Sequence, residues 1–149
     1  MLPKKTPLVQ YKAGPNLTLY CRVPLDGTSA GQQPIFFQHR DGPILPTIKF
    51  VHQFPDFGWT SVTVDKGAIP YILGGANIMC PGLTNAGGIL PASLEANRGV
   101  IILAEGKEHA IAVGTMKMSA EDIRAKNKGI GIEVAHFLGD GLFQTSVIA

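Results

Sequence analysis

The stretch from Val64 to Thr84 reads VDKGAIPYILGGANIMCPGLT and carries the strongest structural signal in the chain. Asp65 suits the N-cap of a short helix, because apolar residues recur behind it at helical spacing. Gly74 and Gly75 then end the helix, and their lack of a Cβ lets a partner approach the backbone closely. An apolar strand that ends on Pro-Gly follows. The stretch therefore predicts a helix, a glycine turn and a strand.

Length and composition indicate a folded chain. With 149 residues it fits one large domain or two small ones with a real core. Apolar residues make up 45% and charged residues 16%, which excludes a disordered tail or a highly charged nucleic-acid binder. Eighteen glycines and eleven prolines favour short strands joined by tight turns.

The small net charge of +2 is unevenly distributed. Residues 1–62 hold six Lys and Arg against three Asp and Glu, whereas residues 63–149 hold seven against eight. We therefore expect any broad attraction to phosphate mostly in the first part.

The spacing of the cysteines and the length of the apolar runs indicate in which cellular compartment the protein is expected. Cys21 and Cys80 lie far apart, without a C-x-x-C pair or paired histidines, so we expect no metal site and a reducing cytosol. The first residues lack the apolar core of a signal peptide. The longest strongly apolar run, Val100 to Ala104, is far shorter than the roughly 20 residues of a membrane helix. A cytoplasmic protein without membrane contact or cofactor is expected.

The first part of the chain reads as a small mixed lobe. Alternating residues predict a strand at 17–23, and 35–39 reads as the returning strand of a hairpin. Pro46 suits the first position of a short helix through about Phe54. Residues 55–59 break that helix, so the expected division is a lobe at 1–62 and a domain at 63–149.

The second part reads as strands with a helix between them. Strands are expected at 100–104 and 109–118, then a helix that Ser119 caps and Lys128-Gly129 ends. Residues 132–138 and 142–147 read as a last hairpin. The fold class is therefore α+β, mainly β, with a small closed or nearly closed barrel.

Three blocks of sequence carry a resemblance to a known family: VDKGAI at 64–69, GANIMCPGLT at 75–84 and VGTMKMSAED at 113–122. With NKGIGIE at 127–133, they resemble the malignant-T-cell-amplified-sequence family of eukaryotic translation factors. That family carries a PUA domain, a small RNA-binding β-barrel, and FFQHRDGP at 36–43 resembles its N-terminal lobe. The resemblance implies a PUA-type β-barrel preceded by a small mixed α/β lobe.

Members of that family bind the small ribosomal subunit as heterodimers with the density-regulated protein. They act in reinitiation, in removing deacylated tRNA during recycling, and in some initiator-tRNA delivery. The resemblance thus implies a non-catalytic RNA-binding factor that contacts a tRNA end or rRNA. Two other classes stay open: the RNA-targeting module of an RNA-modifying enzyme, such as a pseudouridine synthase or tRNA transglycosylase, and a protein-interaction module that binds no RNA.

The chain departs from its relatives at two points. Members of the family it resembles usually carry a helical segment ahead of the point where this chain begins, so we expect either a fragment or a reduced N-terminal lobe. Position 70 is Pro where relatives commonly have Lys. A proline deep in a helix removes a backbone donor, and this one also deletes a cation beside the glycine turn.

The expected RNA-binding residues lie at the helix-to-strand junction and at the end of one later strand. Backbone N–H groups at such a junction can position nucleic acid without many cations. A plain helix stop is the alternative for the glycines, and a solvated surface is the alternative for the lysines. The residues expected to contact RNA are Lys66, Gly67, Ala68, Gly74, Gly75, Ala76, Asn77, Met79, Pro81, Gly82 and Lys117. Possible rRNA contacts in the first lobe are Arg22, Arg40 and Lys49.

Catalytic motifs are not found in the sequence. The four histidines form no H-E-x-x-H, and neither G-x-S-x-G nor a P-loop occurs. Cys80 precedes Pro-Gly at an expected packed junction, so a buried thiol is favoured over a nucleophile. We therefore expect a binding protein and not an enzyme.

Overall fold

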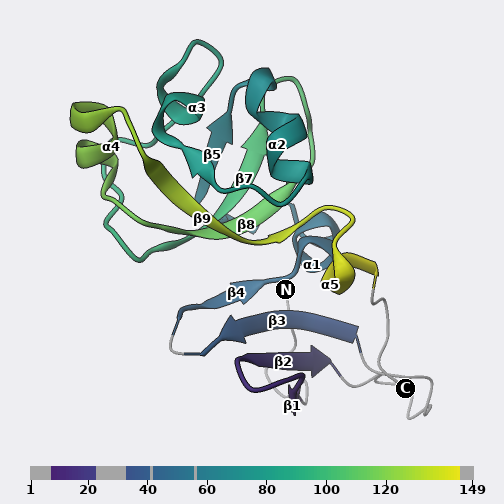
Figure 1. Cartoon of the computed structure of the whole chain (residues 1–149). Helices are drawn as coiled ribbons and strands as arrows, with labels where there is room; N and C mark the ends of the chain where they lie inside the picture. The colour runs from purple at the N-terminus through teal and green to yellow at the C-terminus, as the bar shows by residue number, and fades with distance from the viewer. Residues whose placement is uncertain (1–7, 23–32, 41, 56, 145–149) are drawn as a thin grey trace.

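Two β-sheets, one from each part of the chain, make up most of the structure (Figure 1). The computed structural model describes residues 8–22, 33–40, 42–55 and 57–144. The first sheet is antiparallel, with strand order β1-β2-β3-β4. Its strands are β1 (Leu8–Lys12), β2 (Leu17–Arg22), β3 (Gln33–His39) and β4 (Ile44–Pro46).

The second sheet has five strands in the order β5-β7-β8-β9-β6 and curls into a half-barrel (Figure 1). β5 runs parallel to β7, and the other neighbours are antiparallel. Its strands are β5 (Ser61–Val64), β6 (Ile78–Met79), β7 (Gly99–Ala104), β8 (Ala112–Met116) and β9 (Ile130–Phe137).

The helices are short, so the prediction of a mainly β fold is confirmed. Among the described residues, no helix has the length and apolar character needed to cross a bilayer. The helices are α1 (Ile48–Gln53), the 3-10 turn η1 (Lys66–Ala68), α2 (Ile69–Leu73), α3 (Cys80–Thr84), α4 (Ala120–Lys126) and α5 (Gly141–Gln144).

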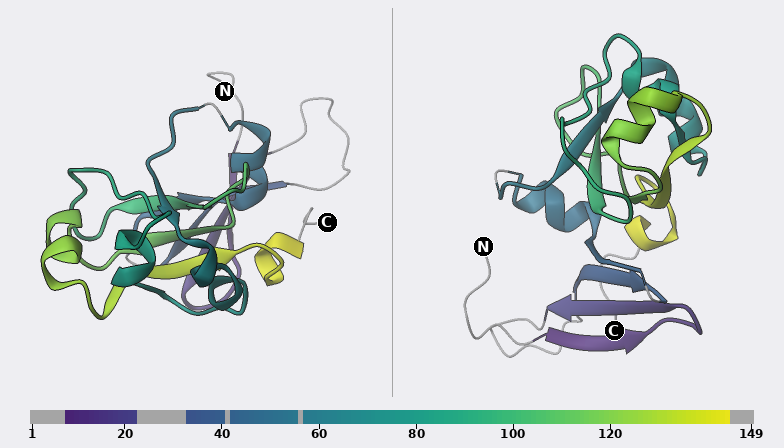
Figure 2. Two further views of the ribbon diagram at one scale, coloured as in Figure 1. Left: turned by 90° about the horizontal axis from the view of Figure 1, so that it is seen from above. Right: turned by 90° about the vertical axis from the view of Figure 1, so that its left-hand side faces the viewer.

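Two apolar cores hold the structure together. One fills the half-barrel beneath α2, α3 and α4. The other joins the two lobes: Phe37 of β3 and Ile48 of α1 are fully buried in one cluster with Val113 of β8. Figure 2 shows α1 and α5 between the two sheets. Because burial of apolar surface drives this contact, the two lobes hold a defined position relative to each other.

His136 of β9 ties the half-barrel to α1. Its side chain is 1% exposed, and its Nε2 accepts a hydrogen bond from the backbone N–H of Ile48 at 3.1 Å. A backbone N–H can only donate, so the ring carries its proton on Nδ1 and donates it to the Asp140 carboxylate at 2.9 Å. Burial lowers the pKa of His136, although Asp140 acts in the opposite direction. Burial between the docked lobes therefore favours the neutral form of His136.

Several local predictions are confirmed. The Asp65 carboxylate accepts from Ala68 N–H at 3.1 Å, and Gly74 is the C-cap of α2. The Ser119 hydroxyl accepts from Asp122 N–H at 3.1 Å and caps α4.

The expected effect of Pro70 needs correction. Pro70 does not lie deep in a helix, because η1 ends at Ala68 and α2 begins at Ile69. It falls in the first turn of α2, where the missing N–H would have no helical partner in any case.

Two predicted strands are wrong in part. The strand after the glycine turn spans only Ile78–Met79, since Pro81 lies in the first turn of α3. The predicted strand at 142–147 begins in α5, because the Asp140 carboxylate accepts from Phe143 N–H at 2.8 Å and starts a helical turn. Residues 145–147, like Val23 of the first predicted strand, lie outside the described residues.

Candidate nucleic-acid interface

A groove of about 280 Å³ runs between η1, α2, α3 and β6 on the surface of the half-barrel. All these elements come from one stretch of sequence, the one in which a capped helix and a strand were predicted. The residues that line the groove are Asp65, Gly67, Ala68, Tyr71, Ile72, Asn77, Ile78, Met79, Gly82 and Asn85.

The groove has an apolar floor and an exposed apolar rim. Ile72 and Ile78 are each 1% exposed and form the floor. Tyr71 is 70% exposed and Met79 is 49% exposed, although both side chains are large and mostly apolar. An exposed aromatic ring offers a flat face on which an unpaired base can stack. The groove is therefore suited to planar apolar groups.

Asp65 holds the walls of the groove together. One carboxylate oxygen accepts from Ala68 N–H at 3.1 Å, and the other accepts from the Asn85 side-chain amide at 2.9 Å. Its own N–H donates to the Gly82 carbonyl at 3.0 Å. Since both oxygens already have partners, Asp65 serves the shape of the groove and is not placed as a catalytic base.

Five of the eleven residues expected to contact RNA line this groove. They come from η1, β6, α3 and the loop before β6, and the two glycines among them offer backbone without side chains. The five are Gly67, Ala68, Asn77, Met79 and Gly82.

The glycine turn at Gly74 and Gly75 does not line the groove. Gly74 and Gly75 lie at the end of α2 and are not among the residues lining the groove. Gly75 has φ +94°, and a Cβ there would lie 3.6 Å from the Phe137 ring of β9. Glycine is needed at position 75 for its backbone conformation, so a change there reports on folding before it reports on binding.

Three further predicted residues also lie outside the groove lining. They are Lys66, Ala76 and Pro81. The backbone N–H of Lys66 donates to the Glu105 carboxylate at 3.1 Å, which holds η1 against the end of β7. Ala76 donates its N–H to the Tyr71 carbonyl at 2.9 Å within the turn after α2.

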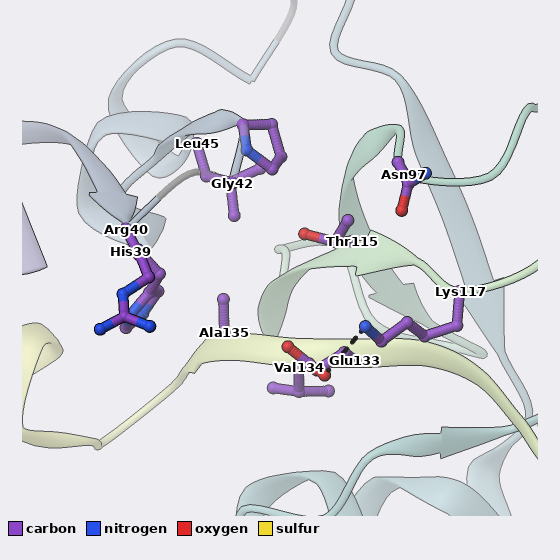
Figure 3. Close-up of a pocket in the computed structure, with 11 residues that line it drawn as sticks. His39, Arg40, Gly42, Leu45, Asn97, Thr115, Lys117, Glu133, Val134 and Ala135 are labelled. Atoms are coloured by element: carbon purple, nitrogen blue, oxygen red, sulfur yellow. Dashed lines mark ion pairs between the residues drawn. The ribbon is translucent and has the colours of Figure 1, made fainter. Parts of the chain in front are cut away.

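Lys117 lies at a second hollow, a cleft of about 680 Å³ where the two lobes meet (Figure 3). Its ammonium group lies 3.3 Å from a Glu133 carboxylate oxygen. Arg40, one of the possible rRNA contacts of the first lobe, lines the same cleft from the opposite side.

Arg40 lies apart from the other two predicted rRNA contacts, since Arg22 also donates to Gln53 of α1 at 3.5 Å, the helix that carries Lys49. Arg22 pairs with Gln33 at the start of β3, whereas Arg40 follows the end of that strand. Lys49 of α1 places its ammonium 4.9 Å from the centre of the Phe143 ring, a cation–π contact. Arg40 alone among the three lines the cleft.

Sequence reasoning missed Tyr71 and Asn85 as groove residues. The signal for Tyr71 was available, since it lies off the apolar stripe of the short helix and an aromatic there must face solvent. Asn85 reaches the groove only through its hydrogen bond to Asp65, a contact over twenty residues that no local pattern indicates.

Cys80 has the environment of a structural thiol. It is fully buried behind the groove, and its sulfur donates to the Lys128 carbonyl at 3.4 Å. Burial raises the pKa of the Cys80 thiol, which keeps it protonated and unreactive. Within the described ranges, no group of three or more His, Cys, Asp or Glu is placed to hold a metal ion.

Two family models match the chain. The PUA domain model matches residues 60–138, and the Pre-PUA-like domain model matches residues 1–55. Translation machinery-associated protein 20 of Schizosaccharomyces pombe is 49% identical over 145 residues, which cover 97% of this chain and 75% of that protein. The malignant T-cell-amplified sequence 1 homolog of Drosophila melanogaster is 53% identical over 119 residues, or 80% of this chain and 64% of that protein.

Solved structures show the same fold. A hypothetical protein from Pyrococcus horikoshii superposes with a TM-score of 0.75 at 23% identity, over 97% of this chain and 82% of that one. A PUA domain protein from Thermoplasma acidophilum superposes with a TM-score of 0.67 at 25% identity, over 95% and 83% of the two chains. The predicted PUA-type architecture is confirmed.

Proposed function

This chain belongs to the family of PUA-domain proteins that includes translation machinery-associated protein 20 and malignant T-cell-amplified sequence 1, and from that premise we propose that it is an RNA-binding factor of the translation machinery. It acts in the cytoplasm on the small ribosomal subunit, in initiation, reinitiation and recycling. The density-regulated protein is its heterodimer partner. The groove beside α2 receives the unpaired acceptor end of a tRNA.

One observation carries the proposal for the groove: exposed Tyr71 and exposed Met79 line it together, over a buried apolar floor. An acceptor end is single-stranded, so its bases are free to stack on an aromatic ring. The bare backbone of Gly67 and Gly82 lets the strand come close. A duplex would instead require a broad positive surface, and the described lining of this groove contains no Lys or Arg.

A binding role fits the chemistry of the groove better than catalysis. Asp65 is the one carboxylate among its described lining residues, and both its oxygens are hydrogen bonded. The thiol of Cys80 behind the groove is buried and protonated. The groove therefore offers shape and stacking without an activated nucleophile or base.

The test is the affinity of the full chain for a single-stranded RNA that ends in CCA, measured by fluorescence anisotropy. We expect Tyr71→Ala to weaken binding about tenfold, because loss of one aromatic stack costs about 1–3 kcal/mol. Tyr71→Phe keeps the ring and should bind within about twofold of the parent.

Phe57→Ala is the matched control, since Phe57 is an aromatic residue 54% exposed outside the groove. Equal binding by Tyr71→Ala and the parent, with both folded, would exclude the groove as the acceptor-end site. Co-sedimentation with small ribosomal subunits, with and without the density-regulated protein, tests the wider proposal independently of the groove.

A further inference from the structure

We propose that the cleft between the two lobes is a second RNA site, which holds one unpaired nucleotide of the strand whose neighbouring end lies in the groove. The inference rests on the RNA-binding function proposed above and adds a separate site to it. Figure 3 shows the two sides of this cleft: His39 and Arg40 on one side, Lys117 and Glu133 on the other.

The cleft is built by segments from both lobes. The first lobe contributes the end of β3, the turn after it and β4, and the second contributes Thr115 of β8 and residues 133–135 of β9. Asn97, in the loop before β7, closes one side. Its volume of about 680 Å³ falls in the range of small-molecule sites, which a single nucleotide occupies comfortably.

Positive charge enters the cleft from both lobes. Arg40 lies on the first lobe, and its guanidinium can hold a phosphate with two parallel hydrogen bonds. Lys117 lies on the opposite side, and its side chain is 47% exposed although its ammonium group is paired with Glu133. A phosphate at Arg40 would leave the rest of a nucleotide pointing across the cleft toward that pair.

The Lys117–Glu133 pair matches the edge of a base. The ammonium is a donor, and the carboxylate of Glu133, whose side chain is 56% exposed, is an acceptor 3.3 Å away. Every RNA base carries at least one donor and one acceptor on its Watson–Crick edge, and these are free when the base is unpaired. Thr115 faces the pair across the β8–β9 register, which aligns it with Glu133, and adds a hydroxyl. A simple phosphate clamp would gain nothing from Glu133, since a carboxylate repels phosphate.

Backbone strain gathers at the same place. Among the described residues, three that are not glycine have positive φ, and two of them line the cleft: Arg40 at +42° and Asn97 at +67°. Such conformations cost free energy and persist where the surroundings hold them, often at binding sites. Arg40 therefore keeps its position in the cleft at some cost to stability, whereas asparagine adopts this conformation more readily.

A direct hydrogen bond joins the cleft to the groove. Asn77, which lines the groove, accepts from the backbone N–H of Val134 at 3.0 Å through its side-chain oxygen. Val134 lines the cleft. β9 runs past both, since Ile132 pairs with β6 at the groove and Glu133 follows immediately. The two sites therefore adjoin the same strand, β9, and the proposal places two parts of one RNA strand in them.

The experiment compares three folded variants of the full chain for binding to a single-stranded RNA octamer that ends in CCA. We expect Arg40→Ala to weaken binding about fivefold or more, because it removes the phosphate partner. Lys107→Ala removes the same charge from the turn after β7, outside both sites, and should change binding less than twofold.

Glu133→Ala is the discriminating variant. It removes a negative charge, so unspecific attraction to phosphate would keep the affinity or increase it. The proposal predicts about threefold or more weaker binding, since a base donor loses its acceptor. Melting temperatures within a few degrees of the parent confirm that the variants are folded.

The outcomes separate the two proposals. If the parent does not bind the octamer, the RNA-binding function itself fails. If Tyr71→Ala weakens binding but Arg40→Ala and Glu133→Ala do not, the groove stands and the cleft proposal is overturned. If Arg40→Ala leaves RNA binding unchanged but weakens binding of a poly-glutamate peptide, the cleft serves an acidic protein segment, which also overturns it.

Discussion

The groove and the cleft are neighbours on one molecule, yet they offer RNA opposite chemistry. The groove combines exposed Tyr71 and Met79 with an apolar floor. The cleft places Arg40 on one side and the Lys117–Glu133 pair on the other. A net charge of +2 therefore says little about how this chain meets nucleic acid. Stacking and close backbone approach can bind where charge is absent, and a few cations can act where they converge.

The two sites also differ in what holds them in shape. All residues that line the groove come from one short stretch, from Asp65 to Asn85, and the Asp65 carboxylate joins its two ends by hydrogen bonds to Ala68 and Asn85. The cleft exists only while the two lobes are docked, through the shared core and the contact of His136 with Ile48. A change that loosens the docking of the two lobes should therefore alter the shape of the cleft before it alters the groove.

The largest expected effect comes from filling the groove. At Gly67 an added Cβ would meet only the Asp65 carboxylate oxygen, at 3.6 Å, so a side chain fits without strain and points into open space. We expect Gly67→Leu to weaken acceptor-end binding by about tenfold or more, measured by anisotropy, because the leucine occupies the space of a base. Gly67→Ala is the graded control and should cost much less. Unchanged affinity in a folded Gly67→Leu variant would mean that bases bind elsewhere.

Acid should destabilise the docked lobes, on which the cleft depends. The pKa of His136 is lowered by burial in the folded state, so the unfolded state takes up the proton more readily below about pH 6.5. The stability that neutral His136 contributes is thus present above about pH 6.5 and is lost as pH falls toward the folded pKa. The slope from this one group is at most about 1.4 kcal/mol per pH unit.

The groups that face His136 are the Asp140 carboxylate and His39, with Lys49 beside it at the surface. Urea unfolding from pH 7.5 to pH 5.5 checks the prediction, and His136→Phe should flatten the curve because it removes the titrating group. If the parent and His136→Phe lose stability in parallel, another group is responsible.

The salt dependence of RNA affinity should also distinguish the cleft from the groove, with a smaller effect. On a plot of log affinity against log salt, Arg40→Ala should make the slope shallower by about 0.7, the value for one phosphate of a single strand. Tyr71→Ala should lower affinity at every salt concentration and leave the slope unchanged, since stacking releases no counterion. If Tyr71→Ala made the slope shallower and Arg40→Ala left it unchanged, the phosphate contact would lie in the groove and not in the cleft.

The smallest effect is expected behind the groove. Cys80→Ser should change RNA affinity less than twofold, because the buried thiol contacts the Lys128 carbonyl and a hydroxyl can donate to the same atom. Rapid reaction of Cys80 with a thiol reagent at neutral pH, measured by mass spectrometry, would contradict the raised pKa.

Sequence reasoning reached the groove because the groove is local. The Asp65 cap, the helix behind it and the stop at Gly74 all follow from side-chain chemistry within a few residues. The prediction was wrong where one short sequence pattern is compatible with two local structures. Asp140 between two glycines was interpreted as a hairpin turn, but its carboxylate starts α5 by accepting from Phe143 N–H.

The cleft could not be predicted in this way. Arg40 and Lys117 were both proposed as RNA contacts, but on separate surfaces of separate lobes. They line one cleft because Phe37 and Ile48 share a core with Val113, and such long-range packing leaves no periodic signal. The sequence patterns therefore identified Arg40 and Lys117 as candidates but did not show that they line the same cleft.

The most direct test of the account is a titration of the ¹⁵N-labelled full chain with a single-stranded RNA that ends in CCA, followed by NMR. We expect the backbone signals of Gly67, Tyr71 and Gly82 to shift first and saturate together, while the signal of Lys107 in the turn after β7 does not move. Shifts confined to other surfaces, with these three signals unchanged at saturation, would contradict the claim that the groove is where this protein holds RNA.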